Sequence, residues 1–309
     1  MNILVTGGAG FIGSSIADAY VRLGHDVVIV DNLSTGVLDN VPKGAPFYQM
    51  DIRDEGFVDV LYEHDIDIIN HHAAQIDVRR SVEDPRYDLS VNVLGSLNVI
   101  EAGLRKNVRR IVFASSGGAG YGEQEYFPAD EKHPIAPCSP YGITKVTVER
   151  YLHYYHVVQG LPYTVLRYTN VYGPRQNPHG EAGVVAIFAD KLLGGAQPII
   201  NGDGLQTRDY VYIDDVVRAN ELVLDMEGSD VFNVSTNTET DVNVIFRILN
   251  EALGSPAEEK HGEAKAGEQQ RSVCAYEKIQ DRFGWKPAMS IEEGLRRTLT
   301  WFQDRMDED

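Results

Sequence analysis

Short apolar runs recur through the first two thirds of the chain, each bounded by glycine, asparagine, aspartate or serine. They occupy residues 3–5, 27–30, 66–69, 111–113 and 164–166, and amphipathic stretches separate most of them. Strands that are apolar throughout are typical of a parallel sheet that helices bury on both faces. The pattern therefore predicts an α/β fold built on a doubly wound parallel sheet.

The rhythm changes after Val171, where glycines punctuate shorter elements. Residues 243–253 and 291–303 carry apolar positions at helical spacing. A chain of 309 residues is about twice as long as one typical domain. We therefore expect a second, smaller α/β region after the sheet.

Composition and charge narrow the class of protein. The chain has 28 Lys and Arg against 46 Asp and Glu, a net charge of −18, which opposes binding to a nucleic-acid backbone. Its two cysteines are too few for a disulfide framework, so we expect a reducing compartment. No run approaches the about 18 apolar residues of a membrane helix, and no basic segment precedes residues 3–5 as in a signal peptide. We expect a cytoplasmic protein without nucleic-acid or membrane partners.

Three evenly spaced glycines follow the first predicted strand. Gly7, Gly10 and Gly13 precede a helix-compatible run over residues 14–23. Glycines here allow a tight turn, close approach of backbone N–H groups to a diphosphate, and close packing of helix on strand. The spacing differs from the commoner Gly-x-Gly-x-x-Gly, and a tight turn without a ligand is the alternative. The segment predicts a Rossmann-type domain that binds a dinucleotide.

Carboxylates follow the second and third predicted strands. Asp31 stands 18 residues after Gly13, where a carboxylate accepts hydrogen bonds from the adenosine ribose and repels a 2′-phosphate. This position favours NAD over NADP, with an ordinary loop aspartate as the alternative. Asp51, followed by Ile52, could place a carboxylate near the adenine amine or be a loop residue alone.

A tyrosine and a lysine share one face of a predicted helix. Ser139 is suited to the N-cap and Pro140 to the first turn, which places Tyr141 and Lys145 at positions i and i+4. A nearby ammonium and the positive charge of oxidised nicotinamide would both favour the phenolate of a tyrosine. The pair predicts an acid/base group, and a solvated helix face is the alternative.

Two adjacent histidines, His71 and His72, invite a metal interpretation. No second cluster of ligand residues accompanies them. We therefore expect core or loop histidines, and no metal site.

The sequence resembles the extended short-chain dehydrogenase/reductase family over nearly its whole length. The shared motifs lie at residues 7–13, 31–33, 72–75, 92, 141–145, 167–174, 208–211 and 283–287. Within that family the chain is most similar to the UDP-hexose 4-epimerases. The resemblance implies an NAD-binding Rossmann domain of residues 1–172 and 206–236, and a smaller C-terminal α/β substrate-binding domain of residues 173–205 and 237–309.

The resemblance also implies an activity. Such enzymes are NAD-dependent isomerases that epimerise UDP-galactose and UDP-glucose at C4 through a 4-keto intermediate. Tyr141 would be the acid/base, and Lys145 would lower its pKa and bind the nicotinamide ribose. The family's serine or threonine position holds Gly117 here, so Ser116 is expected to serve instead, or else a water. Gly117 and Gly118 cannot supply the Asp–Glu pair of the related 4,6-dehydratases, which disfavours dehydration.

The cofactor contacts implied by the resemblance fall into the motifs above. They are Gly7, Gly10, Phe11, Ile12, Gly13, Asp31, Asn32, Asp51, Ile52, Ala73, Ala74, Gln75, Asn92, Tyr141, Lys145 and Tyr168. All but Tyr168 lie in the first half of the chain.

Binding of an anionic sugar nucleotide to so acidic a chain requires local cations. The resemblance assigns the diphosphate to Arg208, with Lys265 in the place of a second arginine and Arg271 close enough in sequence to replace it. It assigns Asn170 to the sugar nucleotide and Glu268 to the uridine ribose. These residues are expected to form the substrate site.

Further implications concern substrate range and assembly. Ser272 stands where some relatives carry a bulky tyrosine that excludes N-acetylated sugars, so UDP-N-acetylhexosamines are expected to be tolerated. A homodimer is expected through helices near residues 93–105 and 143–158. Other sugar-nucleotide chemistry, such as a decarboxylase or a 4-keto reductase, and a non-catalytic NAD-sensing regulator are the alternatives.

Overall fold

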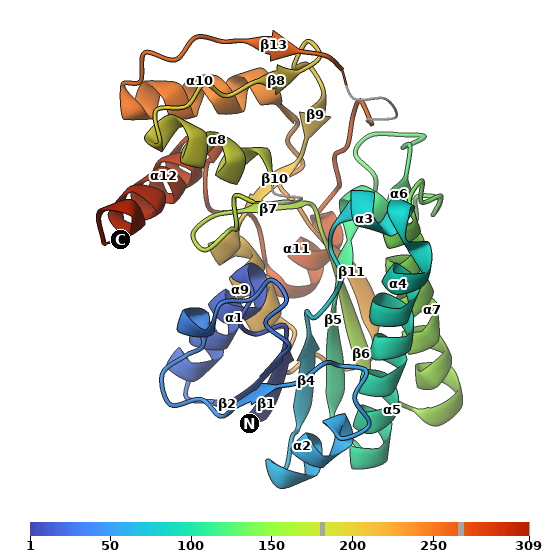
Figure 1. Ribbon diagram of the computed structural model, residues 1–309. Helices are drawn as coiled ribbons and strands as arrows, with labels where there is room; N and C mark the ends of the chain where they lie inside the picture. The colour runs from blue at the N-terminus through green and yellow to red at the C-terminus, as the bar shows by residue number, and fades with distance from the viewer. Residues whose placement is uncertain (180–182, 265–268, 309) are drawn as a thin grey trace. The chain divides into compact units, whose positions relative to one another are not determined.

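A seven-stranded sheet contains all the strands predicted from the apolar runs (Figure 1). The computed structural model describes residues 1–179, 183–264 and 269–308. The strands are β1 (Asn2–Thr6), β2 (Asp26–Asp31), β3 (Phe47–Gln49), β4 (Ile68–His71), β5 (Arg110–Ser116), β6 (Tyr163–Tyr168) and β11 (Asp230–Val234). Their order is β11–β6–β5–β4–β1–β2–β3, and β1–β2, β1–β4, β2–β3 and β4–β5 pair in parallel. The strand order reverses between β1 and β4, which confirms the doubly wound α/β fold and makes the carboxyl ends of these strands the expected ligand site.

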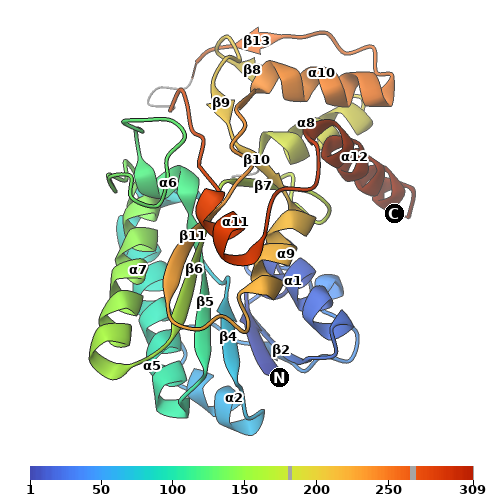
Figure 2. The same cartoon turned by 180° about the vertical axis from the view of Figure 1, so that it is seen from behind.

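Helices cover both faces of this sheet. They are α1 (Phe11–Arg22), α2 (Phe57–Glu63), α3 (Val78–Glu83), α4 (Pro85–Leu89), a π-helical segment (Ser90–Gly95), α5 (Ser96–Lys106), α6 (Gly117–Tyr121), α7 (Pro140–Gln159) and α9 (Ile213–Leu222). In both views α5 and α7 lie side by side, and α1 lies beside α9 (Figures 1 and 2). Within the described ranges, no helix has the length and apolar character needed to cross a bilayer.

One apolar core joins α2, α5 and α7 to the sheet. Its buried members include Leu4, Val30, Ile69, Ile111 and Val165 from the strands, and Phe57, Leu61, Val99, Ile100, Val148 and Leu152 from the helices. Burial of side chains of this size contributes roughly 1.5–3 kcal/mol each. This core fixes α7, and with it the predicted Tyr141 and Lys145, against the sheet.

The chain forms two compact units. The first comprises Met1–Gly122, Ile135–Arg167 and Val217–Phe232, and the second comprises Glu123–Pro134, Tyr168–Val216 and Asn233–Asp309. The second contains β7 (Asn170–Tyr172), α8 (Val184–Leu193), β8 (Ile200–Asn201), β9 (Thr207–Arg208), β10 (Tyr210–Tyr212), β12 (Thr240–Asp241), α10 (Val242–Leu253), β13 (His261–Gly262), α11 (Glu277–Phe283) and α12 (Ile291–Glu308). Both late helices predicted from apolar spacing are confirmed as α10 and α12. Assignment of the units to cofactor and substrate stays a prediction.

A buried ion pair ties α7 to the sheet in the first unit. Glu149 of α7 and Arg167 of β6 are 5% and 6% exposed in their side chains, and Arg167 Nη2 lies 2.5 Å from Glu149 Oε2. Glu149 Oε1 also accepts from Arg167 Nε (3.0 Å) and from Ser115 Oγ of β5 (2.6 Å). Arg167 Nη1 donates to the Tyr121 hydroxyl at 3.0 Å. Each charge is therefore compensated only while its partners remain in place.

Glu149→Ala is expected to lower the free energy of unfolding by about 3–5 kcal/mol, because it leaves a buried guanidinium without its carboxylate. Urea denaturation followed by circular dichroism measures the change. Arg105→Ala is the matched control, since its contact with Glu101 is exposed and is expected to contribute less than about 1 kcal/mol. Equal effects of the two substitutions would contradict the assigned role of the buried pair.

Candidate active site

The glycine turn at the end of β1 forms a cradle that a side chain would fill. Gly7 has a φ of +68°, and a Cβ there would lie 2.7 Å from Ala73 N. A Cβ on Gly13 would lie 2.2 Å from Gly7 O. Gly10 is the N-cap of α1, so the backbone N–H groups of Phe11 and the residues after it point out of the turn. A helix N-terminus with this close approach fits a diphosphate.

Asp31 at the end of β2 is fixed beside this turn. Its carboxylate is 8% exposed and accepts from Ala9 N (3.0 Å) and Leu33 N (2.8 Å). Gly36 packs against it, since a Cβ on Gly36 would lie 2.9 Å from Asp31 Oδ1. The remaining lone pairs of the carboxylate suit the hydroxyls of a ribose.

Asn32, Asp51 and Ile52 lie next to one another after β2 and β3. Asn32 Nδ2 donates to Asp51 Oδ2 at 3.2 Å, and Arg53 donates to both Asp51 oxygens at 2.8 and 2.7 Å. These bonds from Arg53 are the main cause that lowers the pKa of Asp51 to about 2, against the effect of burial. Ile52 is buried, and its carbonyl accepts from Asn98 Nδ2 at 2.7 Å. The two candidates for the adenine contact are therefore rigidly held, and Asp51 is charged at neutral pH.

A hydrogen-bond chain runs from the end of β1 to the π-helical segment through His71. Ala73 N donates to Thr6 Oγ1 (3.2 Å), which lies 2.7 Å from His71 Nδ1. His71 Nε2 lies 2.9 Å from Ser96 Oγ, which donates to Asn92 O at 2.6 Å. Since each hydroxyl has one proton, Thr6 donates to Nδ1 and Nε2 carries the imidazole hydrogen. Burial first, and then Lys145, lower the pKa of His71 to about 3, so it is a neutral core residue.

Asn92 closes the loop that follows β4. Its Oδ1 accepts from Gln75 N (2.8 Å), and its Nδ2 donates to Gln75 O (2.9 Å) and Asp88 Oδ1 (3.0 Å). Both ends of the amide are thereby engaged, so Asn92 acts on this loop through Gln75. The loop includes Ala73 and Ala74, whose small side chains leave room at the carboxyl end of β4.

The helix predicted to carry Tyr141 and Lys145 is confirmed as α7. Ser139 Oγ caps it by accepting from Gly142 N at 3.1 Å, and Pro140 stands in its first turn. Lys145 is 4% exposed, and its Nζ donates to Ala114 O of β5 at 2.9 Å. That ammonium lies 5.8 Å from the centre of the Tyr141 ring. The two side chains therefore share a face, as their spacing indicates.

The electrostatic setting of the pair differs from the simple expectation that Lys145 lowers the pKa of Tyr141. Burial and then the Asp88 carboxylate raise the pKa of Tyr141 well above its ordinary value. Burial lowers the pKa of Lys145 to about 8, although Asp88 and Glu149 both oppose this shift. The chain's own groups thus favour a neutral phenol, and an additional positive charge close by would favour its ionisation.

Ser116, at the end of β5, is the N-cap of α6. Its Oγ accepts from Ala119 N at 3.1 Å, which leaves its O–H hydrogen to be donated elsewhere. Gly117, which the resemblance places at the family's hydroxyl position, is buried in the first turn of α6. The cap is a structural role for Ser116 that is compatible with a second one in catalysis.

In the second unit, strand pairing brings Asn170 and Arg208 together. Asn170 N donates to Asp209 O at 2.9 Å, and Asn170 pairs with Tyr210 in the β7–β10 ladder. Arg208 is half-buried on β9, with Nη1 donating to Thr207 O at 2.8 Å. Asp209 between the strands is 1% exposed and accepts from Thr236 N and Oγ1 at 2.8 and 2.7 Å. This carboxylate anchors the strand junction that presents Arg208.

The other predicted substrate residues have separate environments. Arg271 donates to both oxygens of Glu239 at 2.9 and 2.7 Å, and its guanidinium lies 3.9 Å from the centre of the Phe127 ring. Ser272 is 2% exposed. Tyr168 ends β6 and is buried. Lys265 and Glu268 lie outside the described residues.

Two residues that the sequence did not single out belong to the surroundings of Tyr141. Ser81 Oγ accepts from Tyr141 N at 3.2 Å. Asp88 is fully buried and accepts from Thr144 Oγ1 at 2.9 Å. Asp88 stands four residues before Asn92, and this helical spacing is the feature of the sequence that places the two side chains beside each other.

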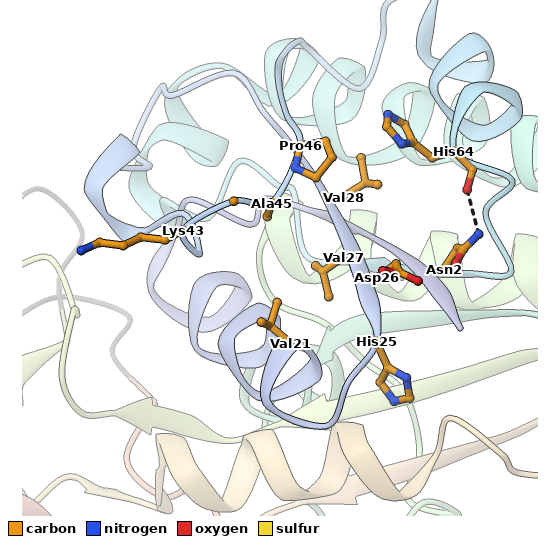
Figure 3. A pocket seen from close by; sticks show the side chains of 11 residues that line it. Asn2, Val21, His25, Asp26, Val27, Val28, Lys43, Ala45, Pro46 and His64 are labelled. Atoms are coloured by element: carbon orange, nitrogen blue, oxygen red, sulfur yellow. Dashed lines mark hydrogen bonds between the residues drawn. The ribbon is translucent and has the colours of Figure 1, made fainter.

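A pocket of about 460 Å³ lies against the amino-terminal half of β2 and is lined by Val27, Val28, Pro46 and His64, among others (Figure 3). The Lys43 side chain extends away from this lining (Figure 3). Ligands of doubly wound sheets bind at the carboxyl ends of the strands, whereas this pocket starts at Asp26, the first residue of β2. We therefore do not assign it to the active site. Within the part of the chain that the structure describes, no group of His, Cys, Asp or Glu side chains is placed to hold a metal.

The glycine cradle, the fixed Asp31 and the Tyr141–Lys145 face define a dinucleotide-dependent enzyme of the short-chain dehydrogenase/reductase type. Residues 3–235 match the model of the NAD dependent epimerase/dehydratase family. This match covers more than half of the chain, and the chain belongs to that family.

Solved structures of known enzymes are similar to this chain over its length. The UDP-glucose 4-epimerase of Thermotoga maritima with UDP-glucose is 44% identical, with a TM-score of 0.97 over 99% of this chain and 100% of that one. The UDP-glucose 4-epimerase of Thermus thermophilus in complex with NAD is 43% identical, with a TM-score of 0.93 over 98% and 99%. A UDP-N-acetylglucosamine 4-epimerase from Methanobrevibacter ruminantium, in complex with UDP-N-acetylmuramic acid, is 35% identical, with a TM-score of 0.94 over 99% of both chains.

Gly13→Ala is expected to weaken NAD binding by more than about tenfold, or about 1.4 kcal/mol, because the new Cβ forces the turn open. Calorimetric titration with NAD measures the change. Gly56→Ala is the matched control, since its Cβ would meet nothing closer than Met50 Cε at 3.9 Å, and binding should be retained. Unchanged affinity in Gly13→Ala would exclude the turn as the diphosphate cradle.

Proposed function

We propose that the protein catalyses NAD-dependent epimerisation at C4 of a UDP-hexose, interconverting UDP-galactose and UDP-glucose. The observation that carries this proposal is the placement of Tyr141 and Lys145 on one face of α7, in the same compact unit as the glycine turn and Asp31. Membership of the epimerase/dehydratase family and the likeness to the Thermotoga maritima enzyme support the UDP-sugar as substrate.

The chemistry divides between the cofactor and the chain. When bound, oxidised NAD supplies the hydride acceptor and then donor at C4, and a positive charge close to the phenol. Tyr141 takes the proton from the sugar O4 and returns it after the 4-keto sugar has rotated. Lys145 holds the nicotinamide ribose and favours the phenolate. Ser116, whose Oγ accepts from Ala119 N, uses its hydroxyl hydrogen to donate to O4.

The proposed cofactor contacts lie in the first unit, except Tyr168, which belongs to the second. Backbone groups of the turn bind the diphosphate, carboxylates bind the adenosine, and the loop after β4 borders the nicotinamide. In chain order these are Gly7, Gly10, Phe11, Ile12, Gly13, Asp31, Asn32, Asp51, Ile52, Ala73, Ala74 and Gln75, with Asn92 acting through Gln75 and Tyr168 from the end of β6.

For the substrate, Arg208 is the proposed diphosphate ligand and Asn170 its neighbour on the sugar nucleotide. Lys265 and Glu268 remain proposals from the resemblance. Arg208 is the stronger candidate because it matches the diphosphate arginine that the resemblance implies, whereas Arg271 donates to Glu239 through Nε and Nη2. The small Ser272 and the Methanobrevibacter ruminantium neighbour support acceptance of N-acetylated sugars.

Incubation of the purified protein with UDP-galactose is expected to form UDP-glucose without net NADH, and Tyr141→Phe should slow this by roughly 10²- to 10⁴-fold through loss of the acid/base. Chromatography of the products and absorbance of NADH provide the readouts, with UDP-N-acetylgalactosamine as a second substrate. Tyr62→Phe, an exposed tyrosine of α2, is the control and should leave the rate unchanged.

Other products would select other functions. Stoichiometric formation of NADH indicates a dehydrogenase, or a 4-keto reductase running in reverse. Carbon dioxide released from UDP-glucuronate, supplied as a further substrate, indicates a decarboxylase. An NAD-binding protein without turnover indicates the sensing regulator. Near-normal turnover in Tyr141→Phe would remove Tyr141 from its assigned role.

A cytoplasmic homodimer through α7 and α5 is also proposed. Ile143, Tyr151, Tyr154 and Val158 on α7 are 51%, 38%, 50% and 61% exposed, and their spacing places them on one helical face. The neighbouring π-helical segment adds Leu94, which is 53% exposed. An exposed apolar face of this kind is typical of a protein–protein interface, and a second copy is the occupant that we propose.

Tyr154→Glu is expected to convert the dimer to a monomer, because it places a charge in the middle of this apolar face. Light scattering coupled to size-exclusion chromatography measures the molar mass. Leu23→Glu, at the exposed end of α1, is the control and should leave the mass unchanged. A wild-type monomer, or a dimer retained in Tyr154→Glu, would contradict the proposed interface.

A further inference from the structure

Asp88 is a fully buried carboxylate that the steps proposed above do not use. It lies on α4 and accepts from Gln75 Nε2 (2.9 Å), Asn92 Nδ2 (3.0 Å) and Thr144 Oγ1 (2.9 Å). These donors are neutral and come from the loop after β4, the π-helical segment and α7. Within the described residues, no lysine or arginine forms an ion pair with Asp88. Its charge is therefore held inside the first unit by neutral groups alone.

A charged carboxylate destabilises the fold when it is buried without a cation beside it. Burial of an unpaired charge costs several kcal/mol, whereas an asparagine carbonyl could accept from the same donors. What the carboxylate adds is negative charge directly beside Thr144, the residue that precedes Lys145 on α7. That charge raises the pKa of both Tyr141 and Lys145. Asp88 therefore acts on both members of the catalytic face at once.

Few other ionisable groups act on the pair. Glu149 of α7 raises the pKa of Lys145, but its carboxylate is already paired with Arg167. His71 and His72 at the end of β4 each have a pKa lowered to about 3, by burial first and then by Lys145, so they are neutral. The charged side chains of α3 and the rest of α4 are exposed: Arg79, Arg80, Glu83 and Arg86. Among the described residues, Asp88 is thus the buried carboxylate near the pair whose hydrogen-bond donors are all neutral.

We propose that Asp88 is a positioning residue for the Tyr141–Lys145 pair, which fixes the catalytic face of α7 through Thr144 and supplies the counter-charge of the buried ammonium. Burial first, and then this same charge, favour the protonated form of Tyr141, and a positively charged cofactor ring beside the phenol would oppose both effects. Proton release is thereby tied to the oxidised state of the cofactor. This inference rests on the proposed function, since it assumes that Tyr141 and Lys145 act on substrate.

Asp88→Asn isolates the charge from the hydrogen bonds. The asparagine carbonyl can accept from Gln75 and Asn92, and its amide can donate to Thr144 Oγ1. The Thr144 hydroxyl can then donate to the backbone carbonyl of Tyr141, which lies 2.9 Å away. Loss of the negative charge is expected to lower the pKa of Tyr141, which would set the acidic limb of the rate profile once the positive charge of the bound, oxidised cofactor has brought that pKa below the pKa of Lys145. It also lowers the pKa of Lys145, which sets the alkaline limb.

Both limbs of the kcat profile of the NAD-loaded protein on UDP-galactose are therefore expected to move to lower pH by about one unit in Asp88→Asn. Absorbance titration of tyrosinate, taken as the difference from the same protein carrying Tyr141→Phe, should show Tyr141 ionising at a correspondingly lower pH. Asp88→Glu and Thr144→Val keep the charge, so they should keep the limbs even where kcat falls.

The outcomes separate this inference from the proposed function. A wild-type protein without epimerase activity overturns the function itself. An active wild type, with Asp88→Asn folded and slower but unshifted in both limbs and in the tyrosinate titration, overturns the role of Asp88. Asp88→Ser removes the charge with a smaller side chain and provides the same comparison if Asp88→Asn does not fold.

Discussion

The buried ammonium of Lys145 needs an acceptor and nearby negative charge, and the structure of the first unit provides both. Lys145 is 4% exposed, and burial alone would favour its neutral form. The Ala114 carbonyl accepts from it, and Asp88 and Glu149 supply nearby negative charge. Each carboxylate is in turn fixed by other elements: Glu149 by β5 and β6, Asp88 by the loop after β4 and the π-helical segment. The groups that stabilise the charge of Lys145 therefore also connect α7 to the neighbouring strands and helices.

The second unit uses a buried carboxylate in a different way. Asp209 is surrounded by donors that are mostly backbone groups, from Thr236, Asn237 and Cys274. Burial raises its pKa to about 6, although these hydrogen bonds oppose the shift. Because three of its partners are backbone N–H groups, Asp209 fixes the path of the chain around Arg208. Asp88, bound by side chains, instead influences the proton affinity of its neighbours.

Local signals in the sequence predicted the scaffold of the site. The spacing of Gly7, Gly10 and Gly13, and the cap that Ser139 and Pro140 give to α7, depend on neighbouring residues alone, so they could be recognised in advance. Apolar runs likewise predicted the strands, because burial on both faces requires them. The same reasoning placed Tyr141 and Lys145 on one face.

Long-range burial determined what the sequence could not predict. Asp88, Glu149 and Arg167 look like ordinary charged residues until the fold encloses them. The contact between Arg271 and Glu239, 32 residues away in sequence, was equally impossible to recognise in advance: Glu239 accepts from Nε and Nη2 of the guanidinium. The pKa of Tyr141 is higher than its spacing from Lys145 suggests, since burial and then the Asp88 carboxylate, far away in sequence, both raise it.

Asp31 shows how closely recognition and architecture are joined in this protein. The oxygens that are proposed to bind a ribose also accept from the amides of Ala9 and Leu33, and Gly36 is packed against them. A designer who replaced this carboxylate to admit a phosphorylated nucleotide would release two backbone segments at the same moment. Re-engineering of coenzyme choice here consequently calls for a rebuilt loop rather than a single exchanged side chain.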